Sequence, residues 1–407
     1  MSLRSFFVDF NSYFASVEQQ LRPELRGLPV GVVPVMAETT CCIAASYEAK
    51  AYGIKTGTQV AEARRLCPDI RIVQARPPVY VDFHHRLVDA VWQCLPVDRV
   101  LSIDEMIGTL GRSQQQRDVA IELAHQVKQT IYDAVGSEMR CSIGIAPNFF
   151  LAKTASKMQK PDGCVVIEDH DLPQCLYALE LGDLYGIGRR MLGRLNKQQI
   201  YTVEDLCNAD KQTLRVVWNG IEGERMYARL RGEHVYTPPT KQGSIGHSHV
   251  LSPDNRSPDA AFAILQKLLQ KAANRLRHGG LVSGRLQLRV DYLNDQTWRD
   301  KLRFDPTDDT LALLHGLKQM WQRRPMDMPA LLRVSVVLTN LFAKQAHSLS
   351  LFDEPRIREQ LNGAIDSINN RFGRNSVYFA GAHRAMDSAP MRIAFTHIPD
   401  PSVEGDN

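Results

Sequence analysis

The order strand, helix, strand, strand, helix, strand occurs twice in this chain, and it limits the possible folds more than any other feature. In the first copy, strands are expected at residues 3–10, 97–103, 106–110 and 140–146, and helices at 12–21, 79–95 and 116–136. In the second, strands are expected at 244–250, 281–293, 296–304 and 330–341, and helices at 257–279 and 307–323. This order is typical of the split βαβ, ferredoxin-like arrangement. The sequence therefore predicts a multidomain α+β protein.

The segments around the two copies suggest where the domains divide. The first copy would comprise residues 1–18 and 76–165, interrupted at 19–75 by a Gly- and Pro-rich insertion with short apolar pieces. Residues 166–232 read as short helices, and "ALELGDLYGIGRRMLGRL" predicts a helix, a glycine turn and a second helix. The polar, Pro-rich residues 233–242 predict a linker before the second copy at 243–345, and residues 346–407 form a C-terminal extension.

Composition excludes several classes of protein. No apolar run is long enough to cross a membrane, and the N-terminus does not resemble a signal peptide. Eight cysteines without a CxxC pair indicate reduced thiols in a cytoplasmic protein. Residues 243–345 hold 15 Lys and Arg against 9 Asp and Glu, so the rest of the chain carries a net charge of −2. This local basic excess suggests a polyanionic partner.

The stretch "VLSIDEMIGTL" places two acids, Asp104 and Glu105, inside an apolar run. On a regular strand they would point to opposite faces, and one charge would be buried without a partner. A hairpin turn between two short strands removes this conflict, because alternation breaks there. Asp9 ends the first strand at the same end of the predicted sheet. Three converging carboxylates repel one another unless cations neutralise them, and Mg²⁺ prefers such oxygen ligands. Two such ions would form the clamp used in phosphoryl transfer.

Four segments resemble the motifs of the Y-family, or translesion, DNA polymerases, in the family's order. These are "DFNSYFASVE", the fingers-like "SYEAKAYGIKTG", the turn "SIDE", and "SIGIAPNFFLAKTASKMQKPDG". The resemblance covers residues ~1–345 and implies a right-hand polymerase. The palm would be residues 1–18 and 76–165, the fingers 19–75, the thumb 166–232 with a helix-hairpin-helix, and the little finger 243–345.

The resemblance also implies roles for individual residues. Asp9 and Asp104 would bridge two Mg²⁺ ions, Glu105 would bind the ion nearer the primer 3′-hydroxyl, and the Phe10 carbonyl would complete the other site. Asn11 stands where many relatives have Asp, and it is not one of the implied ligands. The residues implied to contact the incoming dNTP are Phe14 as the steric gate against a 2′-hydroxyl, and Tyr47, Lys50 and Lys160 at the triphosphate.

Contacts with DNA and with partner proteins are implied for the C-terminal half. The candidates for primer-template DNA are Gly186, Gly188 and Arg189 in the thumb turn, and Arg285, Arg289, Arg299 and Arg303 in the little finger. The segment "SLSLF" resembles the peptide that binds the bacterial sliding clamp, with Leu349, Leu351 and Phe352 as apolar anchors. Buried packing is the alternative for this segment. Residues 368–382 resemble a polymerase V-type chain, so an accessory subunit is a further candidate partner.

The resulting hypothesis is a template-directed, low-fidelity DNA polymerase that transfers nucleotides from dNTPs past damaged bases. It would act in DNA repair and the SOS response. One alternative is a non-catalytic, polymerase-like DNA-binding scaffold, which would be expected to lack at least one of the three carboxylates. Another is a different palm enzyme, such as a nucleotidyl cyclase, which would need neither the helix-hairpin-helix nor the basic second module.

Overall fold

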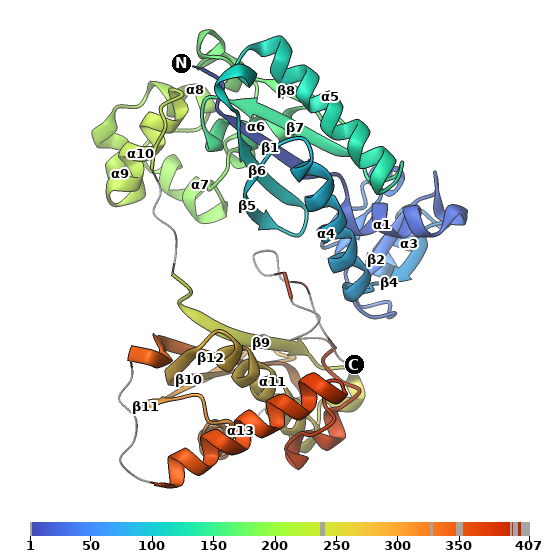
Figure 1. Ribbon diagram of the computed structural model, residues 1–407, viewed down its shortest axis with the longest axis vertical. Helices are drawn as coiled ribbons and strands as arrows, with labels where there is room; N and C mark the ends of the chain where they lie inside the picture. Colours follow the sequence, from blue (N-terminus) through green and yellow to red (C-terminus); the bar gives the residue numbers. More distant parts are fainter. Residues whose placement is uncertain are drawn as a thin grey trace. The chain divides into compact units, whose positions relative to one another are not determined.

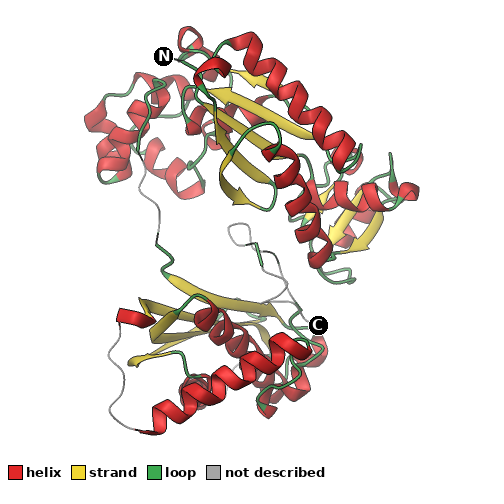
Figure 2. Ribbon diagram, viewed as in Figure 1, coloured by secondary structure: helices red, strands yellow, loops and turns green. Residues whose placement is uncertain are grey.

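A computed structural model describes residues 2–236, 241–325, 329–346, 353–390, 393 and 398–399. The chain divides into two compact units. The first comprises residues 1–237 with a short C-terminal piece at 393–398, and the second comprises residues 238–392 and 399–407. Figures 1 and 2 show helices against sheets in both units, which confirms the predicted α+β class.

The secondary-structure elements follow the predicted order. The strands are β1 (Ser5–Phe10), β2 (Val30–Val33), β3 (Ala44–Ala45), β4 (Arg71–Gln74), β5 (Val97–Ser102), β6 (Glu105–Thr109), β7 (Cys141–Ala146), β8 (Cys164–Val166), β9 (Ser244–Val250), β10 (Leu281–Tyr292), β11 (Thr297–Thr307) and β12 (Leu331–Ala343). The α-helices are α1 (Tyr13–Leu21), α2 (Tyr47–Lys50), α3 (Val60–Leu66), α4 (Pro77–Trp92), α5 (Arg117–Ala134), α6 (Phe149–Met158), α7 (Arg189–Asn196), α8 (Val203–Asn208), α9 (Lys211–Trp218), α10 (Ile221–Leu230), α11 (Pro258–His278), α12 (Thr310–Gln322) and α13 (Asp353–Phe372).

The large sheet of the first unit has the order β5-β6-β1-β7-β8, with β1 at its centre. Strand β1 pairs antiparallel with both β6 and β7. Its side chains alternate between two cores: Phe6 and Val8 pack with residues of α4 and α5, and Phe7 packs with residues of α6. Helix α6 therefore covers the face of the sheet toward which the odd-numbered side chains of β1 project.

Residues between α1 and α4 form a separate small sheet of order β3-β2-β4. Strands β2 and β4 are parallel, and β2 and β3 are antiparallel. The short helices α2 and α3 enclose a small apolar core with this sheet. This sheet places α2 next to the start of α1, as the hydrogen bond from Lys50 to Ser12 shows.

The helical segment that follows the large sheet differs from the prediction at one point. Before the Gly-Ile-Gly turn, only a single 3₁₀ turn forms, at Leu181–Asp183, where a full helix was expected. Asp183 accepts a hydrogen bond from the backbone N–H of Glu180, which closes this turn locally. Gly186 then adopts φ +88°, a conformation that favours glycine, and α7 begins directly after Gly188.

The second unit contains the predicted second copy, as a four-stranded antiparallel sheet of order β11-β10-β12-β9. Helix α11 begins where expected: the Ser257 hydroxyl accepts a hydrogen bond from the Ala260 N–H, and Pro258 is the first helical residue. One face of the sheet forms an apolar core with α11 and α12, contributed by residues such as Leu286, Leu288 and Val290. The opposite face carries mainly polar side chains.

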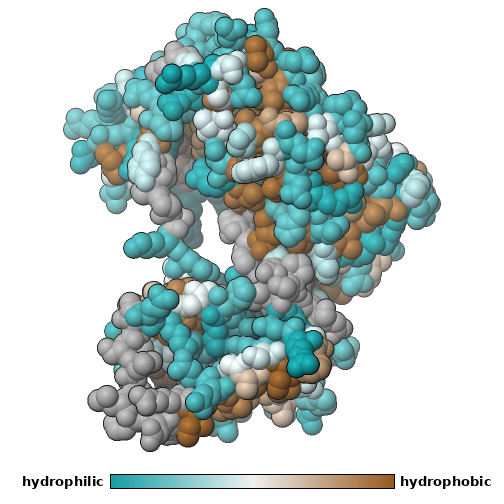
Figure 3. Space-filling model, viewed as in Figure 1, coloured by the Kyte–Doolittle hydropathy of each residue, from teal (hydrophilic) through white to brown (hydrophobic). Residues whose placement is uncertain are grey.

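Helix α13 has its polar side against the second unit and its apolar side toward solvent. Asp366 accepts two hydrogen bonds from Arg277, at 2.6 and 2.8 Å, and the buried Asn362 donates to Asp309. The apolar side chains Ile357 and Phe372 are 65% and 67% exposed. Figure 3 shows hydrophobic side chains on the surface where Figure 1 draws α13. Polar contacts therefore contribute to holding the described part of this helix against the rest of the unit.

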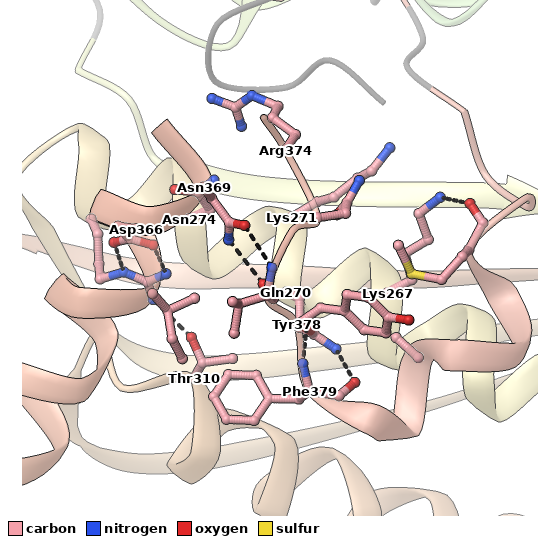
Figure 4. A pocket seen from close by; sticks show the side chains of 16 residues that line it. Lys267, Gln270, Lys271, Asn274, Thr310, Asp366, Asn369, Arg374, Tyr378 and Phe379 are labelled. Atoms are coloured by element: carbon pink, nitrogen blue, oxygen red, sulfur yellow. Dashed lines mark hydrogen bonds and ion pairs between the residues drawn. The ribbon is translucent and has the colours of Figure 1, made fainter. Parts of the chain in front are cut away.

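The residues after α13 also pack on α11. Lys267, which is buried, donates to the carbonyl oxygens of Met386 and Ser388 at 2.6 and 2.7 Å. Gln270 and the backbone of Phe379 exchange two hydrogen bonds. Figure 4 shows the small cavity of about 70 Å³ that lies along this contact. Its lysines and Arg277 bond to protein atoms, which indicates a packing contact within the unit.

Two sequence expectations about the whole chain can be compared with the structure. Within the part of the chain that is described, no helix is long and apolar enough to cross a membrane. All eight cysteines are free thiols, as their spacing predicted.

Candidate active site

Asp9 and Glu105 project from neighbouring strands toward the face of the large sheet that α6 covers. Asp9 lies on the same side of β1 as Phe7, and it is directly opposite Glu105 in the β1–β6 register. Residues directly opposite in antiparallel strands have their side chains close together. The fold thus pairs two of the three predicted carboxylates.

Asp104 lies in the turn between β5 and β6, as the sequence predicted. The turn consists of Ile103 and Asp104, and Glu105 is the first residue of β6. The Asp104 carbonyl accepts a hydrogen bond from the Phe10 N–H at 2.8 Å, which ties the turn to the end of β1. The Ser102 hydroxyl donates to Asp104 Oδ1 at 2.6 Å and lies 3.5 Å from Glu105 Oε2. The two adjacent acids thus share a hydroxyl neighbour and are not divided between opposite faces.

Two lysines that follow β7 in the chain reach these carboxylates. Lys153, on α6, donates to Glu105 Oε2 at 2.7 Å, and its side chain is only 11% exposed. Lys160, in the loop after α6, donates to Asp9 Oδ1 at 2.6 Å. Asn148 caps the start of α6 by accepting from the Leu151 N–H, which fixes where this helix begins. Both acids therefore lie within a network of opposite charge.

Burial and mutual repulsion make Asp9 and Asp104 harder to ionise. The pKa of Asp9 rises from 3.8 to about 6, mainly because the group is buried; the negative charges of Asp104 and Glu105 raise it further, while Lys160 opposes the rise. Burial also raises the pKa of Asp104, against the hydrogen bond from Ser102. Clustered acids with raised pKa values are typical of a site that binds a cation.

The donor set fits magnesium. Three carboxylates at one end of the sheet supply hard oxygen ligands, which Mg²⁺ prefers over nitrogen or sulfur. No histidine or cysteine has its side chain hydrogen-bonded to these acids among the contacts of the described residues. A second acidic group, Glu168, His170 and Asp171, lies on a 3₁₀ turn, where Asp171 accepts from the Glu168 N–H. It plays a local structural part and is separate from the three predicted ligands.

The residues predicted to hold a triphosphate gather near Asp9. Lys50, on α2, donates to the Ser12 hydroxyl at 2.7 Å and lies 4.1 Å from the centre of the Tyr47 ring. The pKa of Lys50 is lowered by burial and by the nearby positive charge of Lys160. Burial and the charge of Asp9 raise the pKa of Tyr47 to about 12. Ser12 occupies the N-cap position of α1, but its hydroxyl makes no capping bond.

Phe14, the predicted steric gate, is half-buried on α1 and stacks on the buried Tyr80, with ring centres 4.7 Å apart. The Tyr80 hydroxyl donates to Glu18, which is fully buried. Glu18 also accepts two hydrogen bonds from Arg76, at 3.1 and 2.7 Å. A buried ion pair therefore supports the ring on which Phe14 rests.

The predicted DNA-contacting arginines of the second unit lie together. Arg285 is opposite Arg303, and Arg289 is opposite Arg299, in the β10–β11 register. All four project from the face of the sheet away from the apolar core, because their neighbours Leu286, Leu288 and Leu302 pack into that core. Arg289 also pairs with Asp291 on its own strand at 2.8 Å, and the remaining positive charges on these adjacent strands favour a polyanion over this face.

In the first unit, Gly186, Gly188 and Arg189 are exposed at the start of α7, while Ile187 between the glycines is buried. The buried Ile187 side chain anchors the turn, and the first backbone N–H groups of α7 stay at the surface. The predicted contact with a DNA phosphate requires such exposed N–H groups. Leu349, Leu351 and Phe352 lie outside the described residues.

Two residues of the site were not among the predicted contacts. Ser102 stands two positions before Asp104, and the alternation of a strand would have placed both on one side. Lys153 had no distinctive local signal, because its partner Glu105 lies 48 positions away in the chain. Only the packing of α6 against the sheet brings them together.

Comparisons with known proteins identify the family of this chain. Residues 8–157 match the impB/mucB/samB family, and residues 242–351 match the C-terminal domain of that family. DNA polymerase IV of Moorella thermoacetica is 32% identical over 383 residues, covering 91% of this chain and 94% of that protein. DNA polymerase IV of Pelotomaculum thermopropionicum is 32% identical over 384 residues, covering 91% and 92%.

Solved structures agree in fold. A Y-family DNA polymerase chimera superposes with a TM-score of 0.71 at 23% identity, covering 83% of this chain and 99% of that one. The insertion ternary complex of Dbh DNA polymerase superposes with a TM-score of 0.57 at 24% identity, with the same coverage. With the carboxylates at the end of the central strand and the family match over both units, the chain belongs to the impB/mucB/samB family and is a Y-family DNA polymerase.

Proposed function

We propose that this polymerase extends primers past damaged template bases by two-metal transfer of nucleotides from dNTPs. The observation that carries the proposal is the placement of Asp9 opposite Glu105, with Asp104 in the adjoining turn. The scaffold alternative would be favoured by the loss of one of these carboxylates, and all three are present. A small fingers sheet beside the site supports an open, tolerant pocket for the nascent base pair.

Asp9, Asp104, Glu105 and the Phe10 carbonyl would hold two Mg²⁺ ions. When bound, the ions would supply the positive charge that acidifies the primer 3′-hydroxyl and neutralises the triphosphate. Lys153 and Lys160 already balance part of the negative charge, which lowers the cost of keeping the acids together.

Tyr47, Lys50 and Lys160 would bind the triphosphate. Lys160 is close enough for its positive charge to lower the pKa of Lys50, so an anion placed between the two ammonium groups would relieve their repulsion. Phe14, held against Tyr80, would leave no room for a 2′-hydroxyl. These residues bind and orient the nucleotide without taking part in bond changes.

Primer-template DNA would contact the arginine-bearing face of the second unit and the Gly186–Gly188 turn. Such contacts reach phosphates rather than base edges, so binding would be independent of sequence and sensitive to salt. Leu349, Leu351 and Phe352 would bind the bacterial sliding clamp. The C-terminal extension would be the place for an accessory subunit of the polymerase V type.

The test is primer extension on templates with and without an abasic site, using the intact chain and Asp104→Ala with Mg²⁺. We expect dNTP incorporation opposite and beyond the lesion by the intact chain and none by the variant. No incorporation by the intact chain, or equal incorporation by both, would contradict the proposal. A Ser102→Ala variant keeps the carboxylates, and we expect it to retain part of the activity.

A separate binding assay tests the clamp contact. We expect Leu351→Ala/Phe352→Ala to abolish binding to the purified sliding clamp while primer extension without the clamp is unchanged. Unchanged clamp binding by this variant would assign the segment to packing.

A further inference from the structure

The loop that carries Lys160 closes tightly between α6 and β8. It runs from Gln159 to Gly163, and a Cβ at Gly163 would lie 1.9 Å from the Gln159 carbonyl oxygen, so no other residue fits there without a shift. From this loop the Lys160 ammonium reaches Asp9, on a strand 151 positions earlier in the chain. A long, exposed lysine side chain has many rotamers, so its position depends on how its backbone is held.

Asn11, just after β1, holds the loop on one side of Lys160. Its Oδ1 accepts a hydrogen bond from the backbone N–H of Asp162 at 2.8 Å. Its Nδ2 donates to the Ser142 hydroxyl at 3.1 Å, and the residue is only 2% exposed. Both polar atoms of the Asn11 side-chain amide are therefore hydrogen-bonded to protein groups. Asn11 is not one of the three candidate metal ligands.

Ser142, on β7, holds the loop on both sides. Its hydroxyl is 3.3 Å from the Gln159 carbonyl oxygen, to which it can donate, and it accepts from the Gly163 N–H at 3.3 Å. The side chain is completely buried. Lys128 fixes the outer side of the loop through Asp162 Oδ1, at 2.9 Å. Backbone groups before and after Lys160 are thus tied to Ser142 on β7 and to Asn11, which directly follows the strand that carries Asp9.

We propose that Asn11 and Ser142 are positioning residues that set where the Lys160 ammonium meets the triphosphate. The inference rests on the proposed role of Lys160. Asn11 directly follows Asp9 and Phe10 in the chain. One short segment therefore carries the Asp9 carboxylate and also holds the loop of Lys160, whose ammonium donates to Asp9. Asn11, which stands where many relatives have Asp, thereby affects nucleotide binding through the loop that carries Lys160. It does so without contacting the nucleotide or the metal.

The test measures the apparent Kd of the incoming dNTP by single-turnover primer extension. We expect Lys160→Ala to weaken dNTP binding about ten- to hundredfold, the range for losing a hydrogen bond to a charged group. We expect Asn11→Ala to weaken it about tenfold, and to add less than twofold when combined with Lys160→Ala, because both act through one group.

Two further variants separate positioning from general loosening of the fold. We expect Asn11→Asp to restore dNTP binding to within about threefold of the parent, since a carboxylate still accepts from the Asp162 N–H. Gln20→Ala removes a comparable bond, from the Glu138 N–H to Gln20 Oε1, on the same unit but away from the loop. We expect it to lower the melting temperature while leaving the dNTP Kd unchanged.

The outcomes separate the two levels of the proposal. If Lys160→Ala leaves the dNTP Kd unchanged, the proposed role of Lys160 is wrong and the positioning role is wrong with it. If Lys160→Ala weakens binding but Asn11→Ala does not, only the positioning role is overturned. Full additivity of the two substitutions, or an effect of Gln20→Ala equal to that of Asn11→Ala, would also overturn it.

Discussion

Replacing Arg76 by methionine would leave a buried charge beneath the proposed steric gate. Glu18 is 0% exposed and accepts two hydrogen bonds from Arg76 and one from Tyr80, whose ring stacks on Phe14. Methionine keeps an unbranched side chain of similar reach but removes the guanidinium. The remaining charged neighbour, Arg22, lies 3.6 Å from Glu18 on the same helix.

The cost follows from burial. Breaking a buried ion pair by removing one partner typically costs ~3–5 kcal/mol. The Arg76 side chain is 35% exposed and Arg22 can partly replace it, so we expect a loss of about 2–3 kcal/mol. For a unit of this size, that corresponds to a fall in melting temperature of about 5–10 °C.

Thermal unfolding followed by near-UV circular dichroism would report the loss in the first unit. The matched control is the double variant Glu18→Gln/Arg76→Met, which has no unpaired charge and should lose less stability than Arg76→Met alone. A melting temperature of Arg76→Met within about 1 °C of the parent would refute the reasoning, since that is the range of ordinary surface substitutions. A double variant less stable than the single one would refute it as well.

Three further predictions concern the two proposed binding surfaces. Hydrogen bonds from three side chains outweigh the effect of burial and lower the pKa of Asp291 from 3.8 to about 2. The stabilisation that ionised Asp291 provides is thus complete above pH ~4 and is lost as the pH falls toward 2. We expect the Asp291→Asn variant to lack this loss of stability between pH ~4 and ~2 in an acid-unfolding experiment. The same acid-unfolding profile for the variant and the parent would contradict this. Phe14→Ala should raise the ratio of rNTP to dNTP incorporation in single-nucleotide primer extension, and an unchanged ratio would remove Phe14 as the gate. Arg299→Gln/Arg303→Gln should weaken binding equally for unrelated DNA sequences and reduce the slope of log K against log salt by about 2. If fluorescence anisotropy shows that the loss of affinity differs between DNA sequences, these arginines contact bases and the prediction is wrong.

Local patterns in the amino-acid sequence predict much of the fold. In β10, Arg285 and Arg289 alternate with Leu286 and Leu288, a pattern typical of a strand with one basic and one apolar face, and the structure has both faces. The adjacency of Asp104 and Glu105 predicted a turn, because a continuous strand would have buried one of them on the wrong face. Such patterns suffice wherever a residue's neighbours along the chain decide its environment.

Other features have no local signal. The helical pattern before Gly186 suggested a full helix, but a side-chain bond within four residues closed a 3₁₀ turn instead. Helix α13 would be expected to bury its apolar side, yet Asp366 and Asn362 find charged and polar partners on other elements and turn that side outward. In both cases, specific hydrogen bonds outweighed periodicity.

The sequence by itself determined the order of elements, the apolar and basic faces of β10 and the position of the acids at the end of the central strand. These follow from the periods of helix and strand, which depend on residues close together in the chain. Only the tertiary structure decided which groups meet those acids. Lys153 and Lys160 reach them because α6 and its following loop pack across the sheet. Asn11, just after β1, and Ser142, on β7, hold that loop although they are 131 positions apart in the chain. Contacts between residues so far apart in the chain depend on how the helices and strands pack together. Such packing produces no periodic pattern in the sequence from which it could be predicted.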